Sequence, residues 1–409
     1  RVQNKVKRVA IINSVCTGST GKISLCLYNY LKEEGIDSYV CYARGKGIDN
    51  VNCYKIGSSF NVFFHYLMSL ILGGEGKYSW WATKKLVLFL KEKNIDTVFA
   101  LLLHGYYLNQ TIIFDYMAKH NIRFIYIMVD EYPLAGKCGC LNGCKRYEIG
   151  CGQCVQVKQY PKTLFFDRSR ELYQWKGKNY AKLKRAVYVG PEFVINHAKN
   201  SPILRDKNLQ ILDEAVNLEV FYPRNCDKLK KELKIGENKI VIVCVTPYFG
   251  VNGAYERKGG IYFKQLAEKF ESDDKYVFVH VGYCAKNESK SSNYITEGYI
   301  HDENRLAEYF SLGDLFVFPS TDDTMPNACL DALGCGTPLL CFNISGMPYI
   351  GDNTVLTLVE PRDVNALIKV VSTVTKKNET TINRCREYAL KRYDSKLYSK
   401  RLVEIAEGL

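Results

Sequence analysis

Short apolar runs alternate with longer amphipathic stretches along almost the whole chain. Uninterrupted β-branched and aromatic runs of this length are typical of parallel strands whose sheet is covered on both faces. Amphipathic stretches between them predict helices, the first of which follows a glycine-rich turn and stops at Gly35. In the first half of the chain, the predicted strands are 6–14, 37–43, 96–103, 123–129 and 186–190.

The same alternation begins again after residue 218. The predicted strands of the second half are 239–247, 275–283, 314–320 and 338–344. Two successive βα runs predict an α/β protein of two Rossmann-like, doubly wound domains. We expect an N-terminal domain over 1–218, a C-terminal domain over 219–394, and a final helix, 395–409, that packs back on the N-terminal domain. Ligands of such sheets bind beyond the carboxyl ends of the strands, so two facing domains would form a central cleft.

The composition agrees with two soluble domains and limits the classes of ligand and partner that the protein is expected to bind. The chain has 409 residues, too many for one ordinary core, and a formal net charge of +13. No nucleic-acid motif accompanies this charge, which therefore favours phosphorylated ligands and an anionic membrane surface. No secretion signal or spanning segment is recognisable, which predicts a cytoplasmic protein, peripheral at the inner face of the membrane. The most apolar stretch, 60–74, is predicted to be either a buried core helix or a membrane-surface helix.

Sixteen cysteines occur, and most stand singly in apolar segments, as expected for small buried side chains in a reducing compartment. Five crowd into a cysteine-rich insertion, 136–160. Four of them have the spacing C-x5-C-x6-C-x2-C and could form a structural zinc site: Cys138, Cys144, Cys151 and Cys154. Disulfides or free thiols, and an iron–sulfur cluster, are the alternatives. No histidine joins the group, so a catalytic metal is not expected.

Three candidate sites follow predicted strands of the N-terminal domain. A glycine-rich loop before the first helix, suited to an anion, comprises Gly18, Ser19, Thr20 and Gly21. His104 follows the strand 96–103, and Asp130 follows the strand 123–129. We expect His104 and Asp130 to lie at the same sheet edge, where a polar side chain could take part in chemistry.

The C-terminal domain carries cations and carboxylates at equivalent places. Arg257 and Lys258 precede a helix, where adjacent cations oppose the helix dipole unless an anion is bound. Thr324 is predicted to cap a second helix whose first turn holds Pro326 and Asn327. Asp323 and Asp331, about 12 Å apart along that helix, are too distant to share a proton. They suit two hydroxyl-bearing groups on either side of a phosphate, which is the layout of a nucleotide sugar.

The stretch "DTMPNACLDALGCGTPLLCF" resembles the acidic signature of retaining GT-B glycosyltransferases of family 4. "RKG" resembles the basic phosphate-binding residue of that family, and "LHGYYLN", "GSTGKI" and "GCGQC" resemble a bacterial polysaccharide-assembly subgroup. In this chain Asp331 stands where the family usually has Glu, Asn252 where it has an upstream Arg, and Val129 where the subgroup has His.

The resemblance implies a role for each matching residue. Asp323 would bind the transferred sugar, Asp331 the ribose diol, and Lys258 the diphosphate. Tyr299 and Ile300 would position the base, and Gly18 to Gly21 would lie near a sugar phosphate or the acceptor. The diphosphate would lie against the segment of Thr324, Met325, Pro326 and Asn327, whose N–H groups (proline has none) would bind it, with Arg257 beside them.

These patterns together predict a retaining glycosyltransferase of hexosyltransferase type with a GT-B fold. It would transfer sugar from a UDP- or GDP-sugar to a lipid-linked or surface-polysaccharide acceptor, without a metal or other cofactor in catalysis. His104, Asp130 and Lys258 are the predicted catalytic residues. The alternatives are a non-transferase or inactive GT-B relative that binds a nucleotide sugar, and a zinc or iron–sulfur protein built on the 138–154 cysteines.

Overall fold

The computed structural model describes residues 5–248, 256–283 and 293–409. The chain divides into two compact units, each with its own parallel sheet. Unit 1 comprises residues 1–214 together with 395–409, and unit 2 comprises residues 215–394. The last helix, α13 (Ser395–Glu407), thus belongs to unit 1 although it follows unit 2 in the sequence.

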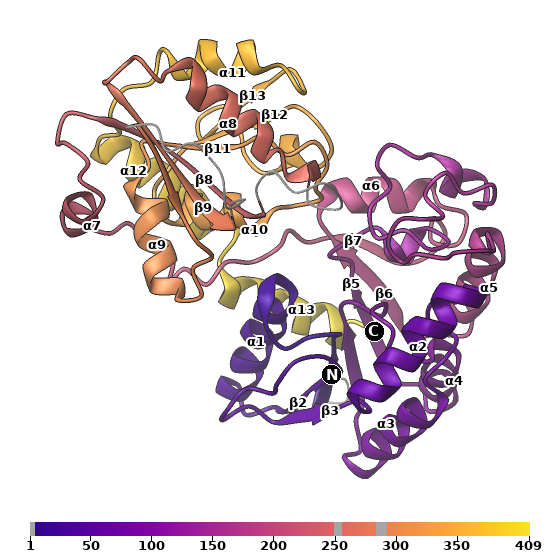
Figure 1. Cartoon of the computed structure of the whole chain (residues 1–409). Helices are drawn as coiled ribbons and strands as arrows, with labels where there is room; N and C mark the ends of the chain where they lie inside the picture. The colour runs from indigo at the N-terminus through magenta and orange to yellow at the C-terminus, as the bar shows by residue number, and fades with distance from the viewer. Residues whose placement is uncertain (1–4, 249–255, 284–292) are drawn as a thin grey trace. The chain divides into compact units, whose positions relative to one another are not determined.

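Unit 1 is built on a seven-stranded parallel sheet in the order β3-β2-β1-β4-β5-β6-β7 (Figure 1). Its strands are β1 (Arg8–Ile12), β2 (Asp37–Tyr42), β3 (Cys53–Lys55), β4 (Thr97–Ala100), β5 (Arg123–Ile127), β6 (Ala186–Gly190) and β7 (Leu209–Ile211). The five inner strands are mostly buried, which explains their largely unbroken apolar sequences. The strand order reverses direction between β1 and β4, and this is where ligands bind in such sheets.

Helices cover both faces of the unit 1 sheet. α1 (Gly18–Glu33) packs against α13, and the Arg185 Nε donates a hydrogen bond to the Leu409 carbonyl at 3.1 Å. Four helices contribute to the core on the other face: α3 (Trp80–Glu92), α4 (Gln110–Lys119), α5 (Ser169–Ala181) and α6 (Glu192–Asn200). α2 (Ser59–Leu72) buries only His65 and Ser69, so the prediction of a buried core helix over 60–74 was wrong.

Unit 2 has a six-stranded parallel sheet in the order β10-β9-β8-β11-β12-β13, which is the Rossmann order 3-2-1-4-5-6. Its strands are β8 (Ile240–Tyr248), β9 (Tyr276–Tyr283), β10 (Tyr294–Glu297), β11 (Leu315–Phe318), β12 (Leu339–Phe342) and β13 (Leu356–Val359). The switch in direction lies between β8 and β11, where Ile242 pairs with Leu315. Two doubly wound α/β units are therefore confirmed.

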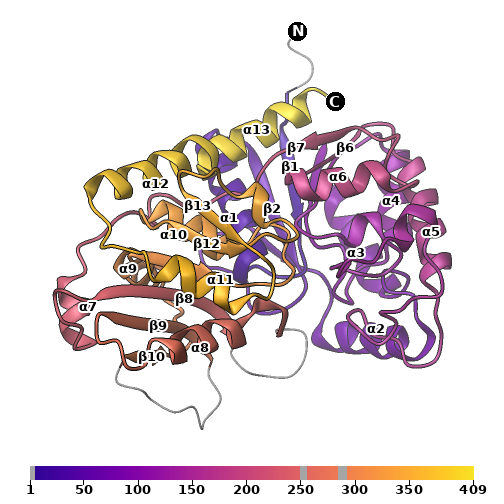
Figure 2. The same ribbon diagram turned by 90° about the horizontal axis from the view of Figure 1, so that it is seen from above.

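Helices also cover both faces of the unit 2 sheet (Figure 2). One face carries α8 (Gly260–Lys269) and α11 (Val364–Val371). The other carries α9 (Glu303–Leu312), α10 (Asn327–Gly334) and α12 (Glu379–Arg392), with the short α7 (Asp227–Glu232) against α9. Both layers pack against buried strands, so the loops at the strand ends are held on a rigid support.

Candidate functional site

The switch point of unit 2 brings together two segments far apart in the sequence. A short 3-10 helix (Glu256–Lys258) precedes α8, and the loop 319–326 follows β11. The carbonyl oxygen of Arg257 accepts hydrogen bonds from the Thr321 N–H at 2.7 Å and the Ser320 hydroxyl at 2.9 Å. Gly259 has φ +74°, and a Cβ there would lie 1.7 Å from the Pro319 carbonyl oxygen, so only glycine permits this contact.

The predicted cations and the predicted sugar-binding carboxylate meet at this point. The Lys258 Nζ forms an ion pair with the Asp323 Oδ2, and the Arg257 Nη1 lies 3.9 Å from the same oxygen. Arg257 also donates to the Asp322 carbonyl at 2.7 Å. The side chains of Lys258 and Asp323 are 17% and 13% exposed, so solvent screens this pair only partly.

α10 begins at Asn327, with Pro326 as its N-cap and no side-chain cap. The prediction that Thr324 caps a helix containing Pro326 was therefore wrong. Pro326 has ψ 119°, an extended conformation, and proline also disfavours helical backbone at the residue before it, Met325. The N–H groups of Asn327 and Ala328 lie in the first turn of the helix, where they have no carbonyl acceptor within the helix. Such a helix start favours an anion.

Two buried polar atoms of this loop and helix start have no hydrogen-bond partner among the described residues. They are the Oδ1 of Asn327 and the Oδ2 of Asp322, whose other carboxylate oxygen accepts from the Ser345 hydroxyl at 2.7 Å. Buried polar atoms are normally satisfied, so unsatisfied ones beside a helix start are typical of a site that awaits a polar ligand. Asp331 lies further along α10 and is only 7% exposed.

Gly346 braces the loop that carries Asp323, a role that sequence reasoning missed. Its N–H donates to the Asp323 carbonyl at 2.8 Å, and a Cβ would lie 1.6 Å from the Thr324 carbonyl oxygen. Tyr299 and Ile300 follow β10 at the same sheet edge. Tyr299 is 44% exposed, and Ile300 packs against the core of unit 2. Asn252 lies outside the described residues.

In unit 1, the structure joins His104 to Asp130. The His104 Nε2 lies 2.6 Å from the Asp130 Oδ2, and its Nδ1 lies 2.9 Å from the Tyr160 hydroxyl. Because a carboxylate only accepts, the Nε2–H of His104 donates to Asp130, and Nδ1 faces the Tyr160 hydroxyl. Burial raises the pKa of Tyr160, which therefore keeps its proton. Asp130 also accepts the Tyr132 N–H at 3.1 Å.

Glu75 holds the loop of His104 and was not predicted. It is 3% exposed, and its Oε1 accepts the N–H groups of Gly105 and Tyr106, both at 2.9 Å. The sequence signal was a single carboxylate among glycines, "GGEG" at 73–76. Two N–H groups aimed at one buried carboxylate oxygen make Glu75 a positioning group for this loop.

The predicted glycine-rich loop forms the first turn of α1. α1 begins at Gly18, so the residues Gly18 to Gly21 are helical instead of preceding the helix. A Cβ at Gly21 would lie 2.4 Å from the Cys16 carbonyl, which requires glycine there. Asn13 braces the turn by donating to the Thr20 carbonyl at 3.0 Å. No acidic residue occupies this first turn, so its amides remain suited to an anion.

The cysteine-rich segment does not assemble the predicted zinc site. Among the described residues, which include Cys138, Cys144, Cys151 and Cys154, no group of three or more His, Cys, Asp or Glu side chains could hold a metal ion. All four are free thiols. Cys138 and Cys154 instead share a hydrogen bond that lowers the pKa of Cys154, and the Cys151 Sγ accepts the Gly136 N–H at 3.2 Å. The thiols present therefore do not fit structural zinc.

Unit 2 of this two-unit α/β protein places cations, carboxylates and a helix start together at its switch point, where such folds bind ligands. The comparisons with known proteins make this class specific. Residues 246–377 match the family model described as Glycosyl transferases group 1. The chain thus carries a glycosyl transferases group 1 domain, and the resemblance to family 4 glycosyltransferases is confirmed.

Curated relatives agree with that match over part of their length. A putative colanic acid biosynthesis glycosyl transferase of Escherichia coli is 20% identical over 281 residues, 63% of this chain and 64% of the relative. An alpha-galactosylglucosyldiacylglycerol synthase of Streptococcus pneumoniae is 26% identical over 177 residues, 39% of this chain and 44% of the relative. A putative teichuronic acid biosynthesis glycosyltransferase of Bacillus subtilis is 26% identical over 121 residues, 29% of this chain and 31% of the relative. In each case this chain covers less than two thirds of the relative.

Solved structures show the fold of the whole chain. The sucrose-phosphate synthase of Thermosynechococcus elongatus aligns with a TM-score of 0.67 at 13% identity, over 98% of both chains. HepE of Anabaena in complex with UDP-glucose aligns with a TM-score of 0.67 at 11% identity, over 98% of this chain and 100% of that one. At such low identity these structures establish the GT-B fold and no more.

Proposed function

We propose that this protein is a retaining glycosyltransferase that transfers a hexose from a nucleoside diphosphate sugar to a lipid-linked or surface-polysaccharide acceptor. The observation that carries the proposal is the meeting of Lys258, Arg257 and Asp323 at the unit 2 switch point beside the start of α10. This constellation lies inside the segment matched by the glycosyl transferases family. The relatives named for polysaccharide and glycolipid synthesis support the acceptor class.

The chemistry follows from where negative charge develops. As the bond between the sugar and the diphosphate breaks, charge grows on the leaving diphosphate. Lys258 and the amides at the start of α10 would stabilise that charge, and Arg257 would add to their field. Lys258 forms an ion pair with Asp323. A bound diphosphate would compete for the Lys258 ammonium group and leave Asp323 to accept hydrogen bonds from sugar hydroxyls.

The remaining residues receive roles by position. Asp331 would hold the ribose diol, and Tyr299 and Ile300 would contact the base. His104 and Asp130 of unit 1 would bind the hydroxyl groups of the sugars, and the leaving diphosphate would help take the acceptor proton. We propose that the first turn of α1 lies near a sugar phosphate or the acceptor. The donor is a UDP- or GDP-sugar, and HepE of Anabaena, solved with UDP-glucose, favours testing UDP first.

Calorimetry with UDP and GDP tests the donor site directly. Lys258→Ala removes a charge-assisted contact, so diphosphate binding should weaken about ten- to a hundredfold. The fold should persist, because Arg257 remains 3.9 Å from the Asp323 Oδ2. Lys269→Ala, an exposed lysine on α8, is the matched control and should bind normally. Equal affinity in the wild type and Lys258→Ala would overturn the assignment.

A further inference from the structure

α2 (Ser59–Leu72) buries polar side chains and exposes apolar ones, the reverse of an ordinary surface helix. It contains no Asp, Glu, Lys or Arg, yet its buried residues are the polar His65 and Ser69. Phe60 and Phe63 are 73% and 59% exposed. The other exposed large side chains of this helix are Phe64, Tyr66, Leu67 and Ile71. A contiguous uncharged face of this kind on a soluble unit marks a contact surface.

Hydrogen bonds on the inner side keep α2 in this orientation. The His65 Nδ1 lies 2.8 Å from the Ser79 hydroxyl, and its Nε2 accepts the Gly76 N–H at 3.3 Å. Burial lowers the pKa of His65, so the ring is neutral and Nδ1 donates to Ser79. Ser69 donates to the Glu75 Oε2 at 3.4 Å. Rolling the helix to bury its aromatics would break these buried contacts, so the exposure of the aromatics is built into the fold.

Two segments next to α2 also carry exposed aromatic or aliphatic side chains. The Leu164 N–H donates to the Leu70 carbonyl at 2.8 Å, which places the exposed Leu164, Phe165 and Phe166 beside the end of the helix. Trp80 and Trp81, also exposed, begin α3 directly after Ser79. We call the exposed side chains of α2, 164–166 and 80–81 the aromatic surface.

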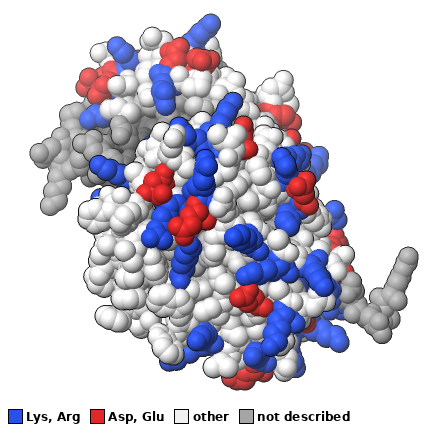
Figure 3. Space-filling model, turned by 90° about the vertical axis from the view of Figure 1, so that its right-hand side faces the viewer, with Lys and Arg blue, Asp and Glu red and all other residues white. Residues whose placement is uncertain are grey.

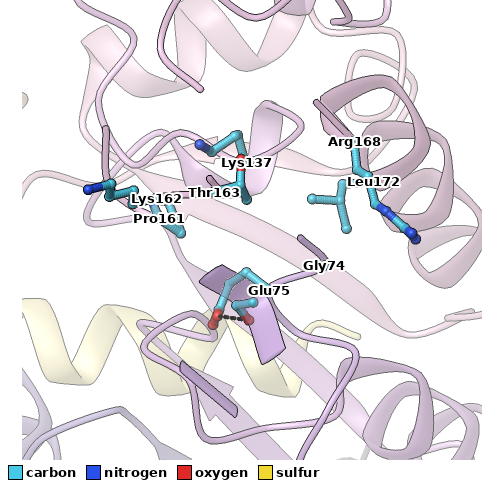
Figure 4. A pocket seen from close by; sticks show the side chains of 9 residues that line it. Gly74, Glu75, Lys137, Pro161, Lys162, Thr163, Arg168 and Leu172 are labelled. Atoms are coloured by element: carbon cyan, nitrogen blue, oxygen red, sulfur yellow. Dashed lines mark hydrogen bonds between the residues drawn. The ribbon is translucent and has the colours of Figure 1, made fainter. Parts of the chain in front are cut away.

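Cations border the aromatic surface. Lys84, Lys85, Lys158 and Lys162 are exposed within these segments or next to them. Nearby acids are already engaged: Glu171 pairs with Lys77, and Asp167 accepts the Cys154 N–H at 2.7 Å. Figure 4 shows Lys162 and Arg168 lining a small pocket from different sides, with Glu75 across from them. Figure 3 shows a broad area without charged side chains on the side of unit 1 that carries α2, with Lys and Arg gathered nearby.

We propose that the aromatic surface docks unit 1 onto an anionic lipid bilayer, with α2 lying in the plane of the interface. Exposed Phe, Leu and Ile would enter the boundary between headgroups and acyl chains, while Trp and Tyr sit at the headgroups. The bordering lysines attract anionic lipids. A second copy of the chain fits less well, because a twofold contact through the same surface would bring lysines against lysines.

The surface lies next to the His104 pair. The ring centroids of Tyr66 and Tyr106 are 5.2 Å apart, those of Tyr106 and Tyr160 are 5.8 Å apart, and Tyr160 contacts His104. The side chains of Tyr106 and Tyr160 therefore connect the aromatic surface to His104. A lipid-anchored acceptor held in the bilayer would lie close to His104 and Asp130. This link to the acceptor rests on the proposed function, whereas the docking itself does not.

Vesicle flotation without any donor tests the docking. Vesicles of phosphatidylglycerol and phosphatidylcholine should float the wild type, and vesicles of phosphatidylcholine alone should float it several-fold less. Phe60→Ser and Phe63→Ser should each weaken partitioning about tenfold, since each removes a large apolar side chain from the interface. Lys162→Glu should weaken it on the anionic vesicles only. Leu390→Ser, an exposed leucine of α12 in unit 2, is the matched control and should float normally.

A second measurement uses the native tryptophans. Two of the three Trp residues belong to the aromatic surface, so brominated lipid should quench wild-type fluorescence, and Trp81→Phe should lose much of that quenching. Flotation unchanged by both Phe variants, or absent quenching, would overturn the proposal. So would a wild-type dimer that Phe63→Ser dissociates without any vesicle binding, which would assign the surface to a second copy. Failed flotation with normal UDP binding would leave the proposed function intact.

Discussion

His104 and Asp130, 26 residues apart in the sequence, meet through a hydrogen bond of 2.6 Å between Nε2 and Oδ2. They follow β4 and β5, which are neighbouring parallel strands. Tyr160 holds the opposite side of the imidazole, so the ring has partners on both nitrogens. An imidazole fixed in this way is held in one orientation, which is what a group engaged in hydroxyl binding requires.

Breaking this pair should lower turnover without affecting the binding of UDP. We expect Asp130→Asn and His104→Asn each to reduce kcat about ten- to a hundredfold, the range for loss of a charge-assisted hydrogen bond to a sugar hydroxyl. UDP affinity by calorimetry should stay unchanged, because the proposed nucleotide-binding residues belong to unit 2. The double variant should be no worse than the poorer single variant, since the two groups act as one unit. Asp115→Asn, on the exposed side of α4, is the control; additive losses would contradict the pairing.

Asp331 should decide whether the protein distinguishes ribose from deoxyribose. In the wild type, UDP should bind about ten- to a hundredfold more tightly than 2′-deoxy-UDP, the value of a hydrogen bond to a charged acceptor. Asp331→Ala should bind both nucleotides equally and weakly, whereas Asp274→Ala, a fully exposed control, should keep the preference. Calorimetry with the two nucleotides measures this. A preference that survives in Asp331→Ala would remove Asp331 from the ribose site.

Gly346→Ala should weaken nucleotide binding indirectly, by displacing the loop that carries Asp323. The new methyl group would lie 1.6 Å from the Thr324 carbonyl oxygen, so the loop that carries Asp323 must move. We expect the free energy of unfolding to fall by about 1–3 kcal/mol, as in other overpacked sites, and UDP binding to weaken. Gly298→Ala is the matched control, because no atom lies within 4 Å of its Cβ position. Denaturant unfolding and calorimetry on both variants give the answer, and equal behaviour would show that the loop tolerates displacement.

His280 should make unit 2 sensitive to acid. Its ring is fully buried, with Nε2 3.0 Å from the Thr246 hydroxyl, and burial lowers its pKa from 6.5 to about 3. Above pH 6.5 the ring is neutral in both the folded and the unfolded state. Between pH 6.5 and about pH 3 only the unfolded state takes up the proton, so stability falls as pH falls, by up to about 1.4 kcal/mol per pH unit.

Replacing this histidine isolates its share of the acid sensitivity. His280→Asn has no proton to gain, so its free energy of unfolding should fall less steeply with decreasing pH than that of the wild type. Denaturant titrations across this pH range compare the two slopes, and other titrating groups contribute equally to both proteins. Parallel curves would show that His280 is protonated in the folded state.

Strand positions and strand ends could be predicted from the sequence. Buried parallel strands have unbroken apolar sequences, and from these sequences the strands β1, β4, β5, β8, β9 and β11 could be predicted. Since ligands gather at the carboxyl ends of these strands, His104, Asp130, Lys258 and Asp323 could be selected as well. The short strands β3, β7, β10 and β13 were not predicted, because three or four half-buried residues carry little periodic signal.

Pairings across long sequence separations could not be predicted. Nothing local connects Lys258 to Asp323, which are 65 residues apart, or Glu75 to the amides of Gly105 and Tyr106. The start of α10 was misplaced because a capping threonine and an N-terminal proline both suit a helix start. Pro326 adopted an extended ψ instead, and the helix begins at Asn327, whereas a Thr324 cap would have started it at Met325.

The sequence by itself determined the two α/β units, since local apolar periodicity specifies which segments become buried strands and covering helices. It also determined which side chains stand at the strand ends. Only the tertiary structure decided which face of α2 meets solvent. The amphipathic pattern of a helix indicates a buried apolar face, but here buried hydrogen bonds of His65 and Ser69 to other segments outweigh it. Those contacts exist only once the chain has folded, so no local pattern could reveal that the aromatic residues face outward.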